Sequence, residues 1–128
     1  MQRRQISTGS PFEARIGYSR AILCDGWVLV AGTTGYDYAT MTMPAEVTDQ
    51  CRNALATIAR ALAEAGATLD DVVRVRYILP DRADWPPCWP IVAEAFALAR
   101  PAATMIVAGL QEPLMKIEIE VTARLPVP

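Results

Sequence analysis

A strongly amphipathic segment, residues 44–65, constrains the fold more than any other part of the sequence. Its apolar residues recur every three or four positions and form a stripe along a helix: Val47, Cys51, Leu55, Ile58 and Leu62. Pro44 suits the first turn of such a helix, and Gly66 suits its end. Because a one-sided helix must lie on another apolar surface, the rest of the chain has to supply one.

That surface is predicted to be a β-sheet. Two apolar runs, Tyr18–Cys24 and Trp27–Gly32, are joined by Asp25-Gly26, which is a strong hairpin signal. Residues 7–11 are expected to be an irregular lead-in to them. Further strands are predicted over 72–79, 102–109 and 115–125, and a second helix over 84–99.

Alternation inside two of these strands assigns side chains to faces. Within residues 72–79, Val73, Val75 and Tyr77 are predicted to share a face. Within residues 115–125, Glu118 and Glu120 are predicted to lie together on the polar face. These patterns indicate strands that each have an apolar and a polar side.

The fold class is therefore α+β, and we expect residues 1–128 to form a single domain. One mixed sheet carries the two helices on one face. Hydrophobic residues make up 52% of the chain, and no third helix is predicted to cover the other face. We therefore expect the protein to be an oligomer that buries this face.

Composition excludes several classes of function. The chain has no histidine, which removes a Ser-His-Asp triad and histidine-based zinc sites. Its cysteines, Cys24, Cys51 and Cys88, are widely spaced, so we expect no metal and no disulfide framework. We expect no cofactor either. With a net charge of −2 and scattered basic residues, nucleic acid is not an expected partner.

The predicted location is the cytoplasm. The polar start, Met1–Gln5, leads into no apolar run of the signal-peptide type, and no apolar run reaches membrane-spanning length. A membrane is therefore not an expected partner, and we expect the partner to be a small organic metabolite.

Several motifs together resemble the YjgF/RidA family of reactive-intermediate deaminases, also called L-PSP endoribonucleases. They include Gly17–Ala21 (GYSRA), Val30–Thr33 (VAGT), Asp70–Val73 (DDVV), Arg100–Thr104 (RPAAT) and Lys116–Ala123 (KIEIEVTA). The resemblance covers nearly the whole chain. It implies a chorismate-mutase-like fold and a homotrimer with a cleft between neighbouring subunits.

The resemblance also implies site residues. In deaminating members a tyrosine, a glycine and a glutamate line the cleft, and they correspond to Tyr18, Gly32 and Glu118. The glutamate helps to place a water that adds to the imine carbon. An arginine clamps the substrate carboxylate, and its position here is Ala103. A cysteine that follows it is Met105 in this chain.

The family's deaminating members also carry an asparagine early in the second helix, and this chain has no counterpart of it near Trp89 and Pro90. We therefore take Tyr18 and Glu118 as the predicted catalytic residues. Trp89, with Ala103 and Met105, is a candidate for an altered substrate-binding wall, although for this tryptophan we favour core or interface packing.

Arg20 is the residue that could replace the clamp. It lies two positions after Tyr18 on a predicted strand, so both side chains are expected to share a face. The alternative is a surface or interface arginine paired with an acidic neighbour. Glu118 and Glu120 have the same two interpretations, acid–base group or salt-bridged polar face, and for Glu120 we favour the second.

The favoured function is metabolite binding in an intersubunit cleft with altered or lost deaminase specificity. An active imine and enamine deaminase, a hydrolase that releases ammonia, is the first alternative. A ribonuclease or translation-inhibitor role is the second, and the charge balance disfavours it.

Overall fold

The computed structural model describes residues 3–127, and the predictions that concern Met1, Gln2 and Pro128 lie outside this range. The elements, in chain order, are β1 (Arg3–Ile6), α1 (Pro11–Ile16), β2 (Ala21–Cys24), β3 (Trp27–Thr34), α2 (Val47–Ala65), η1 (Leu69–Asp71), β4 (Val72–Leu79), η2 (Arg82–Asp84), α3 (Trp85–Ala95), β5 (Ala102–Val107) and β6 (Glu118–Arg124).

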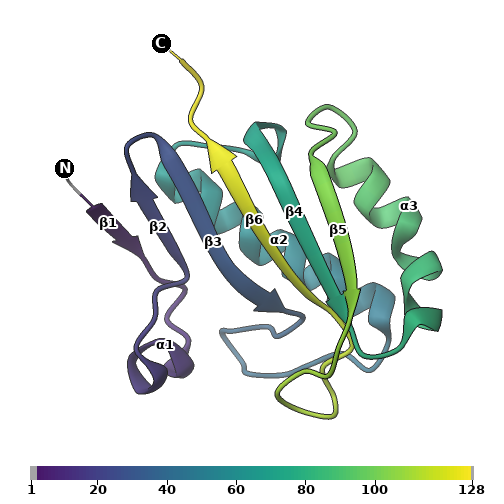
Figure 1. Ribbon diagram of the computed structural model, residues 1–128. Coiled ribbons are helices and arrows are strands. Elements are labelled where there is room, and N and C mark those ends of the chain that lie inside the picture. Colours follow the sequence, from purple (N-terminus) through teal and green to yellow (C-terminus); the bar gives the residue numbers. More distant parts are fainter. Residues whose placement is uncertain (1–2, 128) are drawn as a thin grey trace.

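The strands form one mixed sheet in the order β1-β2-β3-β6-β4-β5. The pair β4–β5 is parallel and connected through α3, whereas the other pairs are antiparallel. Figure 1 shows α2 running behind the centre of the sheet and α3 beside β5. The predicted α+β class, with a mixed sheet and both helices on one side, is confirmed.

The core lies between α2 and the sheet. The predicted stripe of α2 is buried, with Cys51, Ile58 and Leu62 fully inaccessible. On the sheet side, the alternate residues of β6 that face α2, among them Ile119 and Val121, are also buried. The amphipathic pattern in the sequence therefore identified the main packing interface of the fold.

The prediction that Val73 shares a face with Val75 and Tyr77 is wrong. The register of β4 against β6 shifts between Val72 and Arg74, so that Val73 is an extra residue in the strand. Val72 takes the inner position and is buried, while 45% of Val73 is exposed. The alternation of apolar and polar residues in the sequence does not reveal a bulge of this kind.

Two elements at the N-terminus were missed, and the predicted helices and most predicted strands differ from the observed ones by a few residues at their ends. The strand β1 pairs with β2, and α1 begins at Pro11, after the N-cap residue Ser10, whose hydroxyl accepts from the Phe12 amide. Helix α2 starts at Val47, after residues 44–46, and α3 ends at Ala95 with Pro90 inside it. The hairpin turn at Asp25-Gly26 is confirmed, since both residues have positive φ values, 55° and 79°.

The face of the sheet opposite the helices is uncovered in the single chain. Apolar side chains lie on it at Trp27 and Leu29, which are 43% and 49% exposed, and at Ile106 on the edge strand. Charged side chains of β4 and β6 lie between these two apolar parts. Within residues 3–127, no helix combines the length and the apolar character that crossing a membrane requires.

Candidate functional site

A cavity of about 740 Å³ opens beside the ends of β3 and β6 on the uncovered face. Its walls come from the segment before β2, from the loop that follows β3 and from residues 111–115. The predicted residues Tyr18, Arg20, Gly32 and Glu118 all line it. The structure therefore brings together four of the seven residues predicted for the site.

Gly32 lies in a bulge of β3 that makes room for Glu118. The register against β6 shifts between Val30 and Thr33, which leaves Ala31 and Gly32 outside regular pairing. A Cβ on Gly32 would lie 2.8 Å from both Cδ and Oε1 of Glu118. The missing side chain at this position therefore allows the Glu118 carboxylate to lie against the β3 backbone.

The Glu118 carboxyl group is partly withdrawn from water. Burial raises its pKa above the ordinary value, the neighbouring charge of Glu120 raises it further, and the Arg20 charge opposes both effects. Among residues 3–127, no side chain bonds or ion-pairs with this carboxylate. Glu118 is thus a proton acceptor without a fixed partner at the wall of the cavity.

Glu120, two residues along the same face, is already paired. Its Oε1 lies 3.0 Å from Nη1 of Arg76 on β4, and about half of this pair remains exposed. The interpretation of Glu120 as part of a salt-bridged polar face is confirmed. The two glutamates share a face, as predicted, but their surroundings differ.

Arg20 is a buried cation behind the cavity wall. Its side chain is 1% exposed, and Nη1 donates to the Gly32 carbonyl at 2.9 Å and to the Thr33 hydroxyl at 3.0 Å. It makes no ion pair with any of residues 3–127. The alternative of a surface arginine is therefore wrong, whereas that of an interface arginine paired with an acidic neighbour stays a prediction.

The loop that completes the cavity is fixed to α2 by Gln50. The buried Gln50 amide donates to the carbonyls of Pro44 and Leu114 at 2.8 and 2.9 Å, and it accepts from the Lys116 amide at 2.8 Å. These bonds hold residues 114–116, where Met115 lines the cavity. The floor of the site thus depends on one buried side chain.

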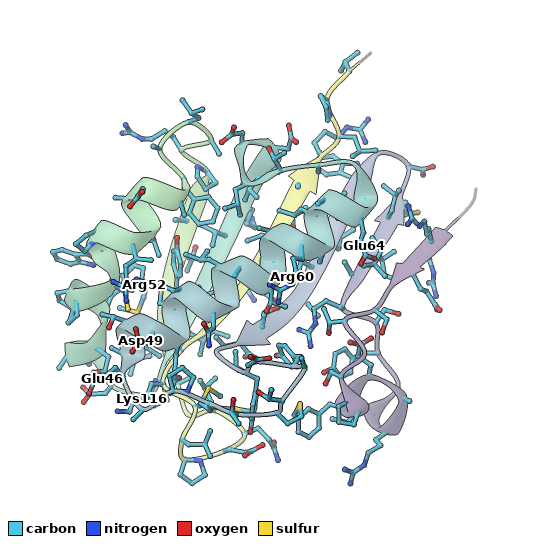
Figure 2. The ribbon with its side chains drawn as sticks, turned by 180° about the vertical axis from the view of Figure 1, so that it is seen from behind. Glu46, Asp49, Arg52, Arg60, Glu64 and Lys116 are labelled. Carbon is cyan, nitrogen blue, oxygen red and sulfur yellow. The ribbon has the colours of Figure 1, made fainter. Side chains whose placement is uncertain are left out.

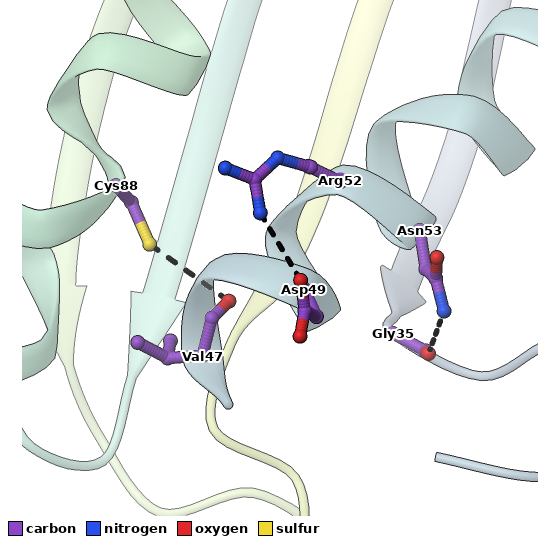
Figure 3. Close-up of polar contacts among 6 residues, drawn as sticks. All are labelled: Gly35, Val47, Asp49, Arg52, Asn53 and Cys88. Carbon is purple, nitrogen blue, oxygen red and sulfur yellow. Dashed lines mark hydrogen bonds and ion pairs between the residues drawn. The ribbon is translucent and has the colours of Figure 1, made fainter. Parts of the chain in front are cut away.

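The first half of α2 is also tied to its neighbours, as Figure 3 shows. Asn53 donates to the Gly35 carbonyl at 3.1 Å, and the Cys88 thiol of α3 lies 4.0 Å from the Val47 carbonyl. The contact at Gly35 fixes the chain just after β3. There is no space for a side chain at position 35, since a Cβ on Gly35 would lie 2.5 Å from Cα of Gln50.

The other three predicted residues lie elsewhere in the chain. Ala103 and Met105 pair with Val75 and Tyr77, so their side chains are on the helix-covered side of edge strand β5. Trp89 on α3 is 54% exposed and lines a groove with Ala103. Glu118, in contrast, pairs with Ile78 and lies on the uncovered side.

The cavity residues that sequence reasoning missed include Tyr36, Tyr38 and Glu112. The Tyr36 hydroxyl donates to the Glu112 carboxylate at 2.9 Å, and burial, followed by this bond, raises the pKa of Tyr36. Tyr38 lies beside it, with ring centroids 5.9 Å apart. The two tyrosines that closely follow Gly35 were a visible signal, but these loop residues have no periodicity that predicts their position.

A second, more polar groove lies along α2, on the side that Figure 2 shows. Arg60 and Glu64 line it, and Arg60 donates to the Thr57 hydroxyl at 3.2 Å. It contains none of the predicted residues. Within residues 3–127, no cluster of three or more metal-ligating side chains occurs.

The chain is similar to several known proteins. The family model described as Endoribonuclease L-PSP matches residues 8–125. The uncharacterized protein SCO2049 of Streptomyces coelicolor is 30% identical over 121 residues, which cover 94% of this chain and 90% of that protein.

Solved structures have the same fold. Rv2704 of Mycobacterium tuberculosis, described as a member of the YjgF/YER057c/UK114 family, is 40% identical with a TM-score of 0.87, and the match covers 97% of this chain and 100% of that one. NMB1025 of Neisseria meningitidis, described as a YjgF family member, is 26% identical with a TM-score of 0.84 over 100% and 98% of the two chains.

Proposed function

Since this chain belongs to the endoribonuclease L-PSP family, also known as YjgF/RidA, we propose that it binds a small metabolite in a cleft between the subunits of a homotrimer, with altered or lost imine and enamine deaminase specificity. The proposed location is the cytoplasm, which agrees with an odd number of widely spaced cysteines.

The observation that carries this proposal is the division of the predicted site within one chain. Tyr18, Gly32 and Glu118 line the cavity on the uncovered face, whereas Ala103 and Met105 point to the other side of an edge strand. These groups can share a pocket only if the β5 edge of one subunit meets the uncovered face of another. The exposed apolar residues on that face, such as Leu29 and Ile106, favour such an assembly.

The altered specificity follows from the edge strand. At the position where the family's deaminating members carry a clamp arginine, this chain has Ala103, which is exposed and uncharged. Met105, two residues on, is partly buried against the core. This wall therefore supplies no charged fork for a substrate carboxylate, and the affinity for short imino acids should fall.

An active deaminase is the second candidate, and the state of Glu118 favours it. An imine is hydrolysed when water adds to its carbon and one proton of the water passes to the nitrogen, and the second proton follows as the carbonyl forms and ammonia leaves. A carboxyl group whose pKa is raised by burial can accept the proton of the water and return it to the nitrogen. Tyr18, on the same wall, can orient the water.

One assay separates the two candidates. 2-Aminoacrylate is generated in situ, and pyruvate release is followed with increasing protein. Acceleration that is lost in Glu118→Gln and retained in Glu120→Gln supports the deaminase. No acceleration, with a small molecule held in the cleft, supports the binding protein.

Sedimentation tests the shared cleft itself. We expect a species of three times the 13.9 kDa of one chain. A stable monomer would refute the proposal, because the two parts of the site would then never meet.

A further inference from the structure

Two hollows of the structure share a wall that is made of tyrosine side chains. One is the cavity of about 740 Å³ on the uncovered face, and the other is the polar groove of about 480 Å³ along α2. Among residues 3–127, Tyr36 and Tyr38 are the two that line both hollows. The partition between the groove and the cavity therefore consists of side chains from a single loop.

Tyr36 is the fixed part of this wall. It is 8% exposed, and its hydroxyl donates to the Glu112 carboxylate at 2.9 Å. Its ring packs against those of Phe12 and Tyr38, with centroids 6.3 and 5.9 Å away. The ring contacts and the hydrogen bond at the end of the side chain together hold Tyr36 in one position.

Tyr38 is held less firmly. Its side chain is only partly buried, and its hydroxyl oxygen lies 3.5 Å from that of Thr34, at the outer limit of a hydrogen bond. Its ring centre lies 4.9 Å from the Arg20 guanidinium. The turn that carries it closes on itself, since the Asp37 amide donates to the Thr42 carbonyl at 2.8 Å. Rotation of the Tyr38 side chain thus gives up one weak hydrogen bond and its ring contacts, and it breaks no backbone bond of the turn.

The proposed assembly calls for a ligand route on the helix side of the sheet. A subunit that covers the uncovered face also covers the side on which the cavity opens. The polar groove lies on the opposite side, where Figure 2 shows Arg60 and Glu64 along α2. Both side chains are exposed, so the groove itself is open to solvent.

The lining of the groove suits the passage of polar molecules. Arg60 donates to the Thr57 hydroxyl at 3.2 Å and makes no ion pair with any of residues 3–127. Asp37 and Glu64 add two carboxylates, and Asn53 adds an amide. Because tight retention of a small molecule requires mostly apolar cover, this hydrated lining favours transit over storage.

We propose that the polar groove is the entrance to the cavity in the assembled protein, and that Tyr38 is the gate between them. This rests on the proposed function in taking the uncovered face as an interface between subunits. Rotation of Tyr38 away from Thr34 joins the groove to the cavity, and its return separates the ligand from bulk water. Tyr36, bound to Glu112, stays in place and limits the width of the opening. The molecules admitted are small and polar, and Arg60 acts on their charge as they enter.

A cysteine inside the cavity tests the route. Ala31→Cys places a thiol on the cavity wall, in a Cys24→Ser background whose remaining cysteines, Cys51 and Cys88, are 0% exposed. The assembled protein is treated with two methanethiosulfonates of similar size, one with a sulfonate and one with a trimethylammonium group, and labelling is followed by mass spectrometry. Tyr38→Ala should raise both rates at least about tenfold, because a gate that is open in about 10% of molecules or fewer slows entry by that factor.

Charge in the groove provides a second test. Arg60→Glu reverses one charge at the proposed entrance, so the ratio of anionic to cationic labelling rates should fall at least about threefold at low ionic strength. The matched control is Arg52→Glu, which makes the same charge change on the same helix but lines a different groove. It should leave the ratio unchanged.

The charge variants are on the surface, so they keep the test valid if Tyr38→Ala fails to fold, which circular dichroism would show. Unchanged rates in folded Tyr38→Ala, or equal ratios in Arg60→Glu and Arg52→Glu, would overturn the inference. Sedimentation of the same samples tests the proposed function separately. A monomer would overturn that function, whereas a trimer in which these substitutions leave labelling unchanged would overturn only the gate.

Discussion

Replacing Gly32 with alanine tests whether the Glu118 carboxylate lies against the β3 bulge as described. The added Cβ would lie 2.8 Å from Cδ and Oε1 of Glu118, whereas ordinary contact begins near 3.4 Å. The carboxylate must therefore move by about 0.6 Å or more. Gly32 does not have a positive φ, so the alanine backbone itself is unstrained.

The magnitude follows from two opposing effects. Overpacking costs about 1–3 kcal/mol, and the low end applies because the displaced group is the end of a flexible side chain. Alanine returns about 0.4–1 kcal/mol by restricting the unfolded chain. We expect Gly32→Ala to lower the free energy of unfolding by roughly 1 kcal/mol and to change ligand binding more than stability, because Glu118 has moved.

A double-mutant cycle isolates this contact. In a Glu118→Ala background the clashing atoms are gone, so Gly32→Ala should become neutral or slightly stabilising, which gives a coupling of about 1–2 kcal/mol. Gly109→Ala is the matched control, since a Cβ there has no atom within 4 Å. The assay is urea unfolding at fixed protein concentration. Additivity within about 0.5 kcal/mol would refute the described placement of Glu118.

Two further predictions concern the groups around the cavity. Gln50→Leu should lower the free energy of unfolding by about 3 kcal/mol or more, because the carbonyls of Pro44 and Leu114 and the amide of Lys116 lose their partner, and thermal melts would show it; an unchanged midpoint would contradict the role of Gln50 in fixing the loop. For Glu118, a folded-state pKa raised above 4.5 means that the folded protein holds this proton more tightly than the unfolded chain. The unfolding free energy should therefore fall as the pH rises above about 4.5, and it should fall less in Glu118→Gln; equal slopes for both proteins would contradict the burial of this carboxyl group.

The overall fold could be predicted from the sequence in those segments where the periodicity of apolar side chains was strong. The stripe of α2 and the alternation of β6 each have one buried side, and the Asp25-Gly26 turn has its own backbone signature. The bulge at Val73 was missed because an inserted residue shifts the alternation without changing composition. The N-terminal strand and α1 are short, and their stability depends on pairing with β2 and on a Ser10 cap.

Prediction of the site succeeded in part for a related reason. Tyr18, Gly32 and Glu118 were assigned by resemblance, and Arg20 by its spacing from Tyr18, and these four line the same cavity. That Arg20 is buried, with its charge acting on Glu13 and Glu118, depends on the packing of distant loops, which residue spacing does not encode. The tyrosines of residues 36–38 belong to such a loop, so only the three-dimensional arrangement shows that they complete the wall.

The division of the site between two faces leads to a complementation experiment. Arginine can be placed on the exposed edge strand by Ala103→Arg, and the double variant Ala103→Arg/Glu118→Gln then has the clamp but not the acid–base group. Wild type has Glu118 but not the clamp. If each cleft combines the β5 edge of one subunit with the uncovered face of another, mixed trimers contain clefts with both groups.

Random mixing of equal amounts should give both groups in about a quarter of the clefts, because each half of a cleft is drawn independently from the two chain types. Pyruvate release from the co-refolded mixture should then exceed that of either protein alone, and Ala103→Arg by itself should be the most active form. A mixture no more active than its components, although Ala103→Arg is active, would mean that arginine and glutamate act within one chain. That result would contradict the geometry, since Ala103 and Glu118 lie on opposite sides of the sheet.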